Sequence, residues 1–346
     1  MPRAKRKRPV RLLLTMGDPC GVGPELCVKA LASRKLPADL ALTVVGSRAV
    51  IAHAAKSGGT RLAARVAQSP AQKAGARAVL DVCDFPIEAL RRRCPTAEGG
   101  RASIRCIETA VRLVLDGCAD GIVTSPISKE AIGAAGSPHP GHTEMLGALS
   151  GVERPVMLLV SGPLRVAFVT THLALRDVPR AITAVGIHHT GKVLAEALRR
   201  YFGIPEPSIA VCSLNPHAGD GGRFGDEEAR LIAPAIEKLR RDGVNASGPL
   251  PSDTLFAKAL RGEYNGVVAM YHDQGMVAVK LSGLADVVNV TLGLPFVRTS
   301  PGHGTAYDIA GTGVADVTST AAAVRLAAGM VRVSLEHPPK SREAGR

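Results

Sequence analysis

Residues 10–32 have the sequence VRLLLTMGDPCGVGPELCVKALA, in which a glycine-rich turn joins an apolar run to a helical pattern. The run Val10–Met16 predicts a buried strand, and Pro24 takes the first position of the helix that follows, where proline is common. The turn could place helix N–H groups against a phosphate. Its spacing is not the dinucleotide fingerprint, because that pattern needs glycine at position 26, where the chain has Leu26.

The same alternation of strand and helix continues along the chain. Strands are predicted at Val10–Met16, Ala41–Gly46, Gly121–Ser125, Val156–Val160, Val166–Thr171, Ile209–Leu214, Gly266–Tyr271 and Val287–Thr291. Helices are predicted at Pro24–Ala32, Ala102–Asp116, Thr190–Tyr201, Asp226–Arg241 and Thr318–Leu335. Strands that alternate with helices are typical of an α/β protein with a largely parallel sheet.

A length of 346 residues suits two domains, and the glycine- and proline-rich stretch Gly133–Gly141 is the best candidate for a crossing between them. The expected parts are a first domain of residues 10–132 plus 301–346, a second domain of residues 133–300, and a basic flexible tail of residues 1–9. The predicted helix at 318–335 should pack back onto the first domain, because nothing after residue 300 resembles a new core.

Composition excludes several classes of protein. With 46% hydrophobic and 21% charged residues, the chain is neither disordered, nor collagen, nor a coiled coil. No stretch approaches 18 uninterrupted apolar residues, and the basic N-terminus leads into an apolar run too short for a signal peptide, so we expect a cytoplasmic protein without membrane partners. The seven cysteines contain no Cys-x-x-Cys pair, which indicates free thiols in a reducing compartment.

The net charge of +13 is concentrated at one end, because six basic residues between Arg3 and Arg11 supply nearly half of it. This tail could bind polyanions, but we favour the interpretation that it is a frayed, solubilising terminus. The chain has no Trp and only ten Phe and Tyr together, so platforms for stacking nucleic-acid bases are scarce. The remaining positive charge suits a small anionic substrate, and we expect no nucleic-acid partner.

Three histidines share a position at the end of a predicted strand. His172 ends one run, His217 follows another, and His272 ends a third. In open α/β sheets, the carboxyl ends of strands converge on the ligand crevice. Three imidazoles there would form an open metal site, with positions left for water or substrate oxygens. The alternative is three separate, hydrogen-bonded loop histidines.

Polar residues that could bind an anion lie nearby in the sequence. His142 and Thr143 follow a glycine-rich approach and offer an imidazole, a hydroxyl and backbone N–H groups. Lys280, Asn289 and Arg298 follow at nine-residue intervals near predicted strand ends. Each alone is more often a solvated surface residue, but all three in one crevice would suit a phosphorylated acid.

Seven motifs occur in one order: TMGDPCGVGPE at 15–25, GHTE at 141–144, TTHL at 170–173, LNPHAG at 214–219, PSDTLF at 251–256, MYHDQG at 270–275 and HGTA at 303–306. Together they resemble the 4-hydroxythreonine-4-phosphate dehydrogenase family of pyridoxal phosphate biosynthesis. The resemblance runs from about Val10 to His337. It implies two α/β/α domains like those of isocitrate and isopropylmalate dehydrogenases, with the active site in the interdomain cleft at a homodimer interface.

The resemblance also assigns roles to residues. The metal ligands would be His172, His217 and His272, with His272 supplied by the partner subunit of a homodimer with shared active sites. The substrate-binding residues would be His142, Thr143, Lys280, Asn289 and Arg298. The cofactor-binding residues would be Gly17, Asp18, His303, Gly304, Thr305, Ala306 and Asp308, and the stretches Leu292–Ser300 and His303–Gly311 are similar to the adenosine-binding loop of the wider superfamily.

The reaction implied is the oxidation of 4-phosphooxy-L-threonine with NAD or NADP, followed by decarboxylation. It would use one divalent metal ion per site (Zn²⁺, Co²⁺ or Mg²⁺), and Asp253 or Lys280 would assist proton transfer. Cys20, Arg223 and Pro301 depart from the commonest family pattern. These departures leave open a related dehydrogenase of erythronate or threonate 4-phosphate, or of a cyclic diol dicarboxylate. A polyanion-binding protein with a decayed active site is the remaining alternative.

Overall fold

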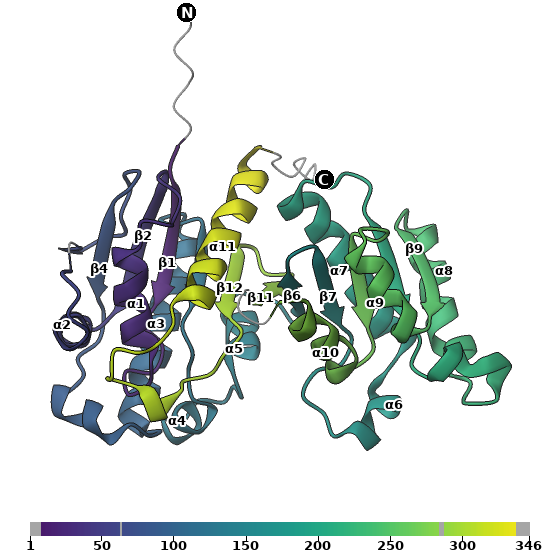
Figure 1. Cartoon of the computed structure of the whole chain (residues 1–346), viewed down its shortest axis with the longest axis horizontal. Coiled ribbons are helices and arrows are strands. Elements are labelled where there is room, and N and C mark those ends of the chain that lie inside the picture. The colour runs from purple at the N-terminus through teal and green to yellow at the C-terminus, as the bar shows by residue number, and fades with distance from the viewer. Residues whose placement is uncertain (1–7, 63, 284–286, 337–346) are drawn as a thin grey trace, which may run out of the picture. The chain divides into compact units, whose positions relative to one another are not determined.

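The computed structural model describes residues 8–62, 64–283 and 287–336, and it divides into two compact units (Figure 1). The first unit comprises the residues up to Glu153 together with Leu294–Arg332, and the second comprises Arg154–Gly293 and the residues from Val333. This division places residues 133–153 and 294–300 in the first unit, whereas the sequence analysis assigned them to the second domain, and it places the residues from Val333, which were assigned to the first domain, in the second unit. The predicted α/β class is confirmed.

The strands of the first unit are all parallel and lie in the order β3-β4-β2-β1-β5-β12. Their bounds are β1 Val10–Thr15, β2 Leu40–Gly46, β3 Arg65–Ala67, β4 Arg77–Asp81, β5 Gly121–Thr124 and β12 Val297–Pro301. Consecutive residues Leu12, Leu13 and Leu14 of β1 are all buried. Burial on both faces is what a parallel strand requires when helices cover both sides of it.

The helices of the first unit follow the strands. They are α1 Gly23–Ala32, α2 Arg48–Ser57, α3 Ala97–Leu115, α4 Lys129–Ala134, α5 His142–Leu149 and α11 Thr318–Glu336, with 3₁₀ turns η1 Ile87–Arg92 and η5 Tyr307–Ile309. α3 packs on β1, β2 and β5. The hydroxyl of Thr299 in β12 donates to the carbonyl of Ala323 in α11 over 2.9 Å, so most of this helix packs on the first unit, as predicted (Figure 1), while its last residues, from Val333, belong to the second unit.

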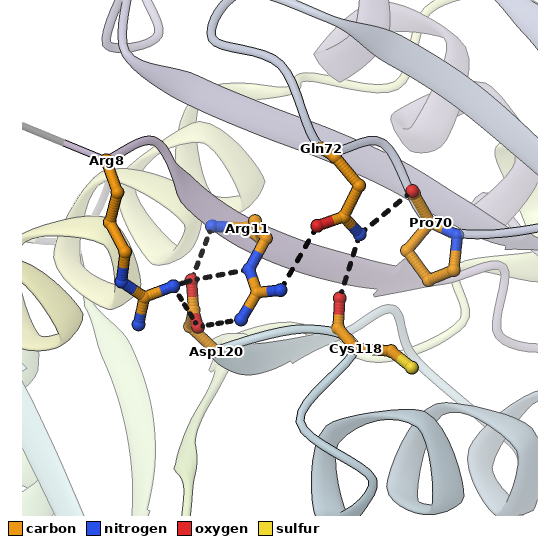
Figure 2. A network of polar contacts seen from close by, with 6 residues as sticks. All are labelled: Arg8, Arg11, Pro70, Gln72, Cys118 and Asp120. Carbon is orange, nitrogen blue, oxygen red and sulfur yellow. Dashed lines mark hydrogen bonds and ion pairs between the residues drawn. The ribbon is translucent and has the colours of Figure 1, made fainter.

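Two of the N-terminal basic residues are part of this unit (Figure 2). Asp120 accepts hydrogen bonds from Arg11 Nη2 at 2.7 Å, from the Arg11 backbone N–H at 2.9 Å and from Arg8 Nη1 at 3.1 Å. Burial alone would raise the pKa of Asp120, but these hydrogen bonds and the two cations outweigh it and lower the pKa. Arg8, which the sequence analysis placed in a flexible tail, is therefore anchored to the first unit, and residues 1–7 of the predicted tail lie outside the described residues.

The strands of the second unit lie in the order β11-β6-β7-β10-β8-β9. Their bounds are β6 Val156–Ser161, β7 Leu164–Phe168, β8 Ser208–Cys212, β9 Asn245–Leu250, β10 Gly266–Ala269 and β11 Val288–Leu292. β6 is antiparallel to both β7 and β11, while β7, β10, β8 and β9 pair in parallel. The parallel group brings the carboxyl ends of β7, β8 and β10 to one edge.

The helices of the second unit are α6 Val178–Ala181, α7 Ala184–Phe202, α8 Ala233–Arg241, α9 Ser252–Leu260 and α10 His272–Ser282, with short turns η2 Leu175–Asp177, η3 Pro216–Gly222 and η4 Glu228–Ile232. α7 begins where the Thr183 side chain accepts from the Gly186 N–H at 3.0 Å, and it ends at Gly203, whose φ of +67° suits glycine. α7 and α10 both pack on β6, β7 and β10.

Several sequence expectations were wrong in detail. β3, β4, β9 and β12 were not predicted, and β12 occupies part of the stretch Leu292–Ser300 that was assigned to a cofactor loop. Lys280 lies in α10 and not near a strand end. Asn289 and Arg298 are the second residues of β11 and β12, at their amino ends. In the part of the chain that the structure describes, no helix is long and apolar enough to cross a membrane.

Candidate active site

His172 and His272 lie side by side in the second unit. After β7 and β10 end, the two segments remain hydrogen-bonded, with the Val169 N–H donating to Ala269 O at 2.9 Å and the Thr170 hydroxyl donating to Met270 O at 2.7 Å. This pairing carries the two rings to a centroid separation of 5.6 Å. His272 Nδ1 lies 2.6 Å from Asp273 Oδ1. Such a carboxylate contact is common for metal-binding histidines and leaves Nε2 for a ligand.

His217 lies after β8 in a loop of unusual backbone. Residues 217–221 all have positive φ, beginning with 53° at His217. A run of left-handed residues must be held by its surroundings. Glu228, which is 6% exposed, holds the start of the loop, because Oε1 accepts from the Leu214 and Asn215 N–H groups at 2.8 Å and Oε2 accepts from Asn215 Nδ2 at 3.0 Å. Sequence reasoning missed Glu228.

Gln274 connects the His217 loop to the His272 segment. Its Oε1 accepts from the Met270 N–H at 2.7 Å, and its Nε2 donates to Ser213 O at 2.7 Å. The loops that bear two of the three histidines are therefore linked by one side chain. Gln274 was also missed, although it lies in the quoted motif MYHDQG.

We call the side chains of His172, His217 and His272 the histidine edge. Imidazole donors suit a divalent transition metal, and the His172–His272 pair with its Asp273 contact fits that use. Among residues 8–62, 64–283 and 287–336, however, no group of three or more His, Cys, Asp or Glu side chains is arranged to hold a metal ion. The structure thus brings two of the predicted ligands together in one chain, but not all three.

Two of the predicted substrate residues, His142 and Arg298, lie in the first unit and interact electrostatically. Arg298 is 2% exposed, and its Nη2 donates to Thr124 Oγ1 at 2.6 Å. Burial lowers its pKa to about 10, which still leaves it charged at neutral pH. Burial, reinforced by the charge of Arg298, holds the pKa of His142 well below its ordinary value. His142 Nε2 is buried and has no hydrogen-bond partner in the described part of the chain. The neutral imidazole of His142 and the buried cation of Arg298 could therefore both bind an anion.

The other predicted substrate and catalytic residues are placed separately. Thr143 follows His142 at the start of α5. Asn289 has a buried Oδ1 without a hydrogen-bond partner among the described residues, which suits a ligand that donates. Asp253 on α9 and Lys280 on α10 are both exposed. Asp253 Oδ1 accepts from the Thr254 N–H at 2.9 Å.

The predicted cofactor residues come together in the first unit. Asp18 is fully buried, and it accepts from the Cys20 N–H at 2.9 Å and from the Tyr307 hydroxyl at 2.8 Å. Burial raises the pKa of Asp18, although these hydrogen bonds oppose the shift. The Val22 N–H donates to Thr305 O at 2.9 Å. The glycine-rich turn that contains Gly17 and Asp18 therefore packs on the segment that contains His303, Gly304, Thr305, Ala306 and Asp308.

A glycine is required at the contact between these two segments. A Cβ on Gly21 would lie 2.8 Å from the Thr305 carbonyl oxygen. Further along the same surface, Lys29 Nζ donates to the carbonyl of Gly313 at 2.8 Å, and Glu25 accepts from the Gly311 N–H. The turn and the segment 303–313 are thus joined by several hydrogen bonds and form one continuous surface that exposes backbone N–H groups, a type of surface that can bind phosphate.

Comparisons with known proteins agree with this architecture. Residues 39–327 match the family described as "Pyridoxal phosphate biosynthetic protein PdxA". The chain is 47% identical over 328 residues to the 4-hydroxythreonine-4-phosphate dehydrogenase of Geobacter metallireducens, covering 93% of this chain and 96% of that protein. It is 44% identical over 340 residues to a Bradyrhizobium diazoefficiens protein provisionally named D-threonate 4-phosphate dehydrogenase, covering 92% and 97%.

Solved structures show the same fold. The 4-hydroxythreonine-4-phosphate dehydrogenase of Klebsiella pneumoniae superposes with a TM-score of 0.84 at 39% identity, covering 93% of this chain and 99% of that one. A terephthalate 1,2-cis-dihydrodiol dehydrogenase from Burkholderia xenovorans superposes with a TM-score of 0.66 at 30% identity, covering 93% and 98%. The class is therefore the α/β dehydrogenases of the isocitrate and isopropylmalate type. Within it, the chain belongs to the PdxA family of pyridoxal phosphate biosynthesis, as the motifs predicted.

Proposed function

We propose that the chain oxidises 4-phosphooxy-L-threonine with NAD⁺ or NADP⁺ to 2-amino-3-oxo-4-phosphooxybutanoate, which decarboxylates to 3-amino-2-oxopropyl phosphate. The observation that carries the proposal is the 47% identity, over 93% of this chain, to a dehydrogenase of that name. The coenzyme supplies the hydride acceptor. The residues of this chain bind and orient the reactants.

We further propose that the histidine edge holds one divalent metal ion. His172 and His217 would bind it from one chain, and His272 would come from the second subunit of a homodimer. Imidazole ligands favour Zn²⁺ or Co²⁺ over Mg²⁺. When bound, the ion would supply Lewis acidity at the substrate hydroxyl and at the carbonyl formed from it. Asp273 would fix the orientation of the His272 ring, and Glu228 would fix the loop that presents His217.

The predicted substrate residues would share the recognition of the charged groups of the substrate. Arg298 supplies a cation whose burial strengthens its attraction to phosphate or carboxylate. His142 remains neutral at pH 7 and offers a hydrogen bond, while Thr143 adds a hydroxyl. Lys280 and Asn289 are the predicted substrate residues of the second unit. Asp253 or Lys280 is the proposed proton-transfer group, since both are exposed and able to exchange protons with solvent.

The test is a steady-state assay with authentic 4-phosphooxy-L-threonine and each coenzyme, in metal-free protein and after adding Zn²⁺, Co²⁺ or Mg²⁺. Reduction of the coenzyme should require the added metal and should be accompanied by release of CO₂. Coenzyme reduction without CO₂ would contradict the second half of the reaction. No turnover with any metal would contradict the proposed function as a whole.

A second candidate is a dehydrogenase for a substrate without the amine, namely erythronate or threonate 4-phosphate. The 44% identity to the provisionally named D-threonate 4-phosphate dehydrogenase favours it. A cyclic diol dicarboxylate is the third possibility within the family, because the dihydrodiol dehydrogenase shares the fold at 30% identity. Specificity constants for the three substrates, measured side by side, distinguish the candidates.

A further inference from the structure

The first unit contains a cavity of about 190 Å³ that is lined by Ala310 and Gly311, at the end of the predicted adenosine-binding stretch His303–Gly311, and by none of the cofactor residues predicted individually. Its walls come from the turn before α1 with the first residues of that helix, from α2, from η1 with the residue after it, and from the turn that follows η5. Pockets for whole drug-sized ligands are usually about 300 Å³ or more, so this cavity suits one end of a larger molecule. It adjoins the surface formed by the glycine-rich turn and residues 303–313, because Gly21 and Gly311 contribute to both.

The cavity wall contains a buried carboxylate, Glu25, one of whose oxygens lacks a hydrogen-bond donor within the part of the chain that the structure describes. Glu25 is 5% exposed, and one of its oxygens accepts from the Gly311 N–H. The other oxygen, Oε2, is buried without a hydrogen-bond partner among the described residues. A buried acceptor without a partner is costly, so a hydroxyl or amino group from a ligand would stabilise the site.

The remaining lining separates into apolar side chains and cations. Pro24, Val50 and Leu90 offer apolar surface against which a flat base can pack. Arg91 and Arg93 are exposed and also line the cavity. A terminal nitrogen of Arg93 lies 3.8 Å from where a Cβ on Gly311 would be, which places the guanidinium over the same turn that contacts Glu25. The arginine between them, Arg92, does not line the cavity and pairs with Glu98 at 3.8 Å.

We propose that this cavity binds the adenosine end of the coenzyme and that Arg91 and Arg93 hold a 2′-phosphate there, so that the chain prefers NADP⁺ to NAD⁺. The lining suits a ligand with an apolar face, hydrogen-bond donors and an anionic group, and the adenosine 2′-phosphate of NADP⁺ has all three. Guanidinium pairs suit phosphate because their N–H groups match its oxygens. The inference rests on the proposed function only in taking the coenzyme to be a nicotinamide dinucleotide.

The test is calorimetric binding of 2′,5′-ADP and 5′-AMP to the full chain, which needs neither substrate nor metal. The wild-type chain should bind 2′,5′-ADP about tenfold to a hundredfold more tightly than 5′-AMP. The double variant Arg91→Gln with Arg93→Gln should bind the two ligands about equally, with 5′-AMP changed less than about threefold. Arg92→Gln is the matched control, since it removes one cation from the same turn, and it should retain the preference.

Equal affinities of the wild-type chain for the two ligands would overturn the inference. So would a loss in Arg92→Gln as large as in the double variant, because that would reflect net charge and not this cavity. The oxidation assay distinguishes a failure of the proposed function from a failure of the proposed coenzyme preference. Selective binding of 2′,5′-ADP without oxidation of 4-phosphooxy-L-threonine would contradict the proposed function alone, whereas oxidation that proceeds equally well with NAD⁺ and NADP⁺ would contradict the coenzyme preference alone.

Discussion

The glycine-rich turn of the first unit and the histidine edge of the second are held in place in different ways. In the turn, a predicted site residue itself fixes the backbone: the Asp18 side chain accepts hydrogen bonds from the Cys20 N–H and the Tyr307 hydroxyl. At the histidine edge, other residues fix the backbone: Glu228 holds the His217 loop, and Thr170 holds the end of β10. Substitutions in the turn should therefore reduce stability, and substitutions of the histidines should reduce activity.

The largest effect should follow loss of a predicted metal ligand. In His172→Ala and His217→Ala, kcat/KM should fall about a thousandfold, because Lewis acidity contributes several kcal/mol and each 1.36 kcal/mol is tenfold in rate. Both side chains are exposed, so the unfolding midpoint should hardly change. Metal content per chain and kcat/KM are measured on the same preparations.

The control for these variants is His189→Ala, which removes a histidine of the same unit whose Nε2 lies 2.8 Å from Arg154 O. It should retain both metal and activity. Full activity of metal-free His217→Ala would remove this histidine from the site. A lowered unfolding midpoint in His172→Ala would contradict the contrast between the two regions.

The opposite pattern is expected for Asp18→Ala. The substitution leaves the Cys20 N–H and the Tyr307 hydroxyl without their acceptor in a fully buried place, which should cost about 2 kcal/mol of the free energy of unfolding. Asp18→Asn should recover part of the loss, since an amide oxygen can accept one of the two hydrogen bonds. Urea denaturation measures both, and metal content should stay at the wild-type value. An unchanged midpoint for Asp18→Ala would show that the turn does not depend on this carboxylate.

Subunit mixing tests whether the histidine edge is shared. If His272 serves the partner's site, each hybrid of a His172→Ala chain and a His272→Ala chain holds one intact ligand set. Random exchange should then restore about a quarter of wild-type activity, because half of the dimers are hybrids and half of their sites are intact. The 5.6 Å between the rings of His172 and His272 in one chain motivates the competing result. If both ligate the same ion from one chain, verified exchange will restore nothing.

The sequence predicted the placement of His172 and His272 better than it predicted the residues that hold the histidine edge. Apolar runs mark where β7 and β10 end, so the positions of His172 and His272 followed from pattern alone. Glu228 and Gln274 could not be found this way, because their partners depend on a left-handed loop and on a contact between neighbouring strand ends. β12 was missed because Arg298, a charged residue, is buried within it. The cavity beside Glu25 depends on four separate segments, and no local spacing encodes it.

A smaller effect concerns the pH dependence of stability in the first unit. Burial and the charge of Arg298 hold the pKa of His142 well below its ordinary value, so below about pH 6.5 the unfolded chain binds a proton that the folded chain does not. Stability from this residue is therefore complete above that pH and is lost as pH falls toward the folded-state pKa. The slope is at most about 1.4 kcal/mol per pH unit. His142→Gln should reduce the pH dependence of the free energy of unfolding between pH 6.5 and 5, by an amount that corresponds to the uptake of about one proton, while His189→Gln should not. Urea denaturation at a series of pH values measures this dependence.

The smallest effect should come from the basic N-terminus. Deleting residues 2–7 keeps Arg8 and its contact with Asp120 (Figure 2), so the first unit should retain its stability. If the deleted charges act on the substrate only through long-range attraction, which salt screens, kcat/KM should stay within about twofold.

Arg298→Ala provides the contrast. It removes a buried cation from beside His142 and should weaken substrate binding about tenfold to a hundredfold. Arg298→Lys should recover only part, because the planar fork is lost. Both comparisons are made at one ionic strength, with the unfolding midpoint of each variant measured alongside. If the truncation weakens substrate binding more than Arg298→Ala does, the phosphate is held by the tail and not by the buried arginine of β12.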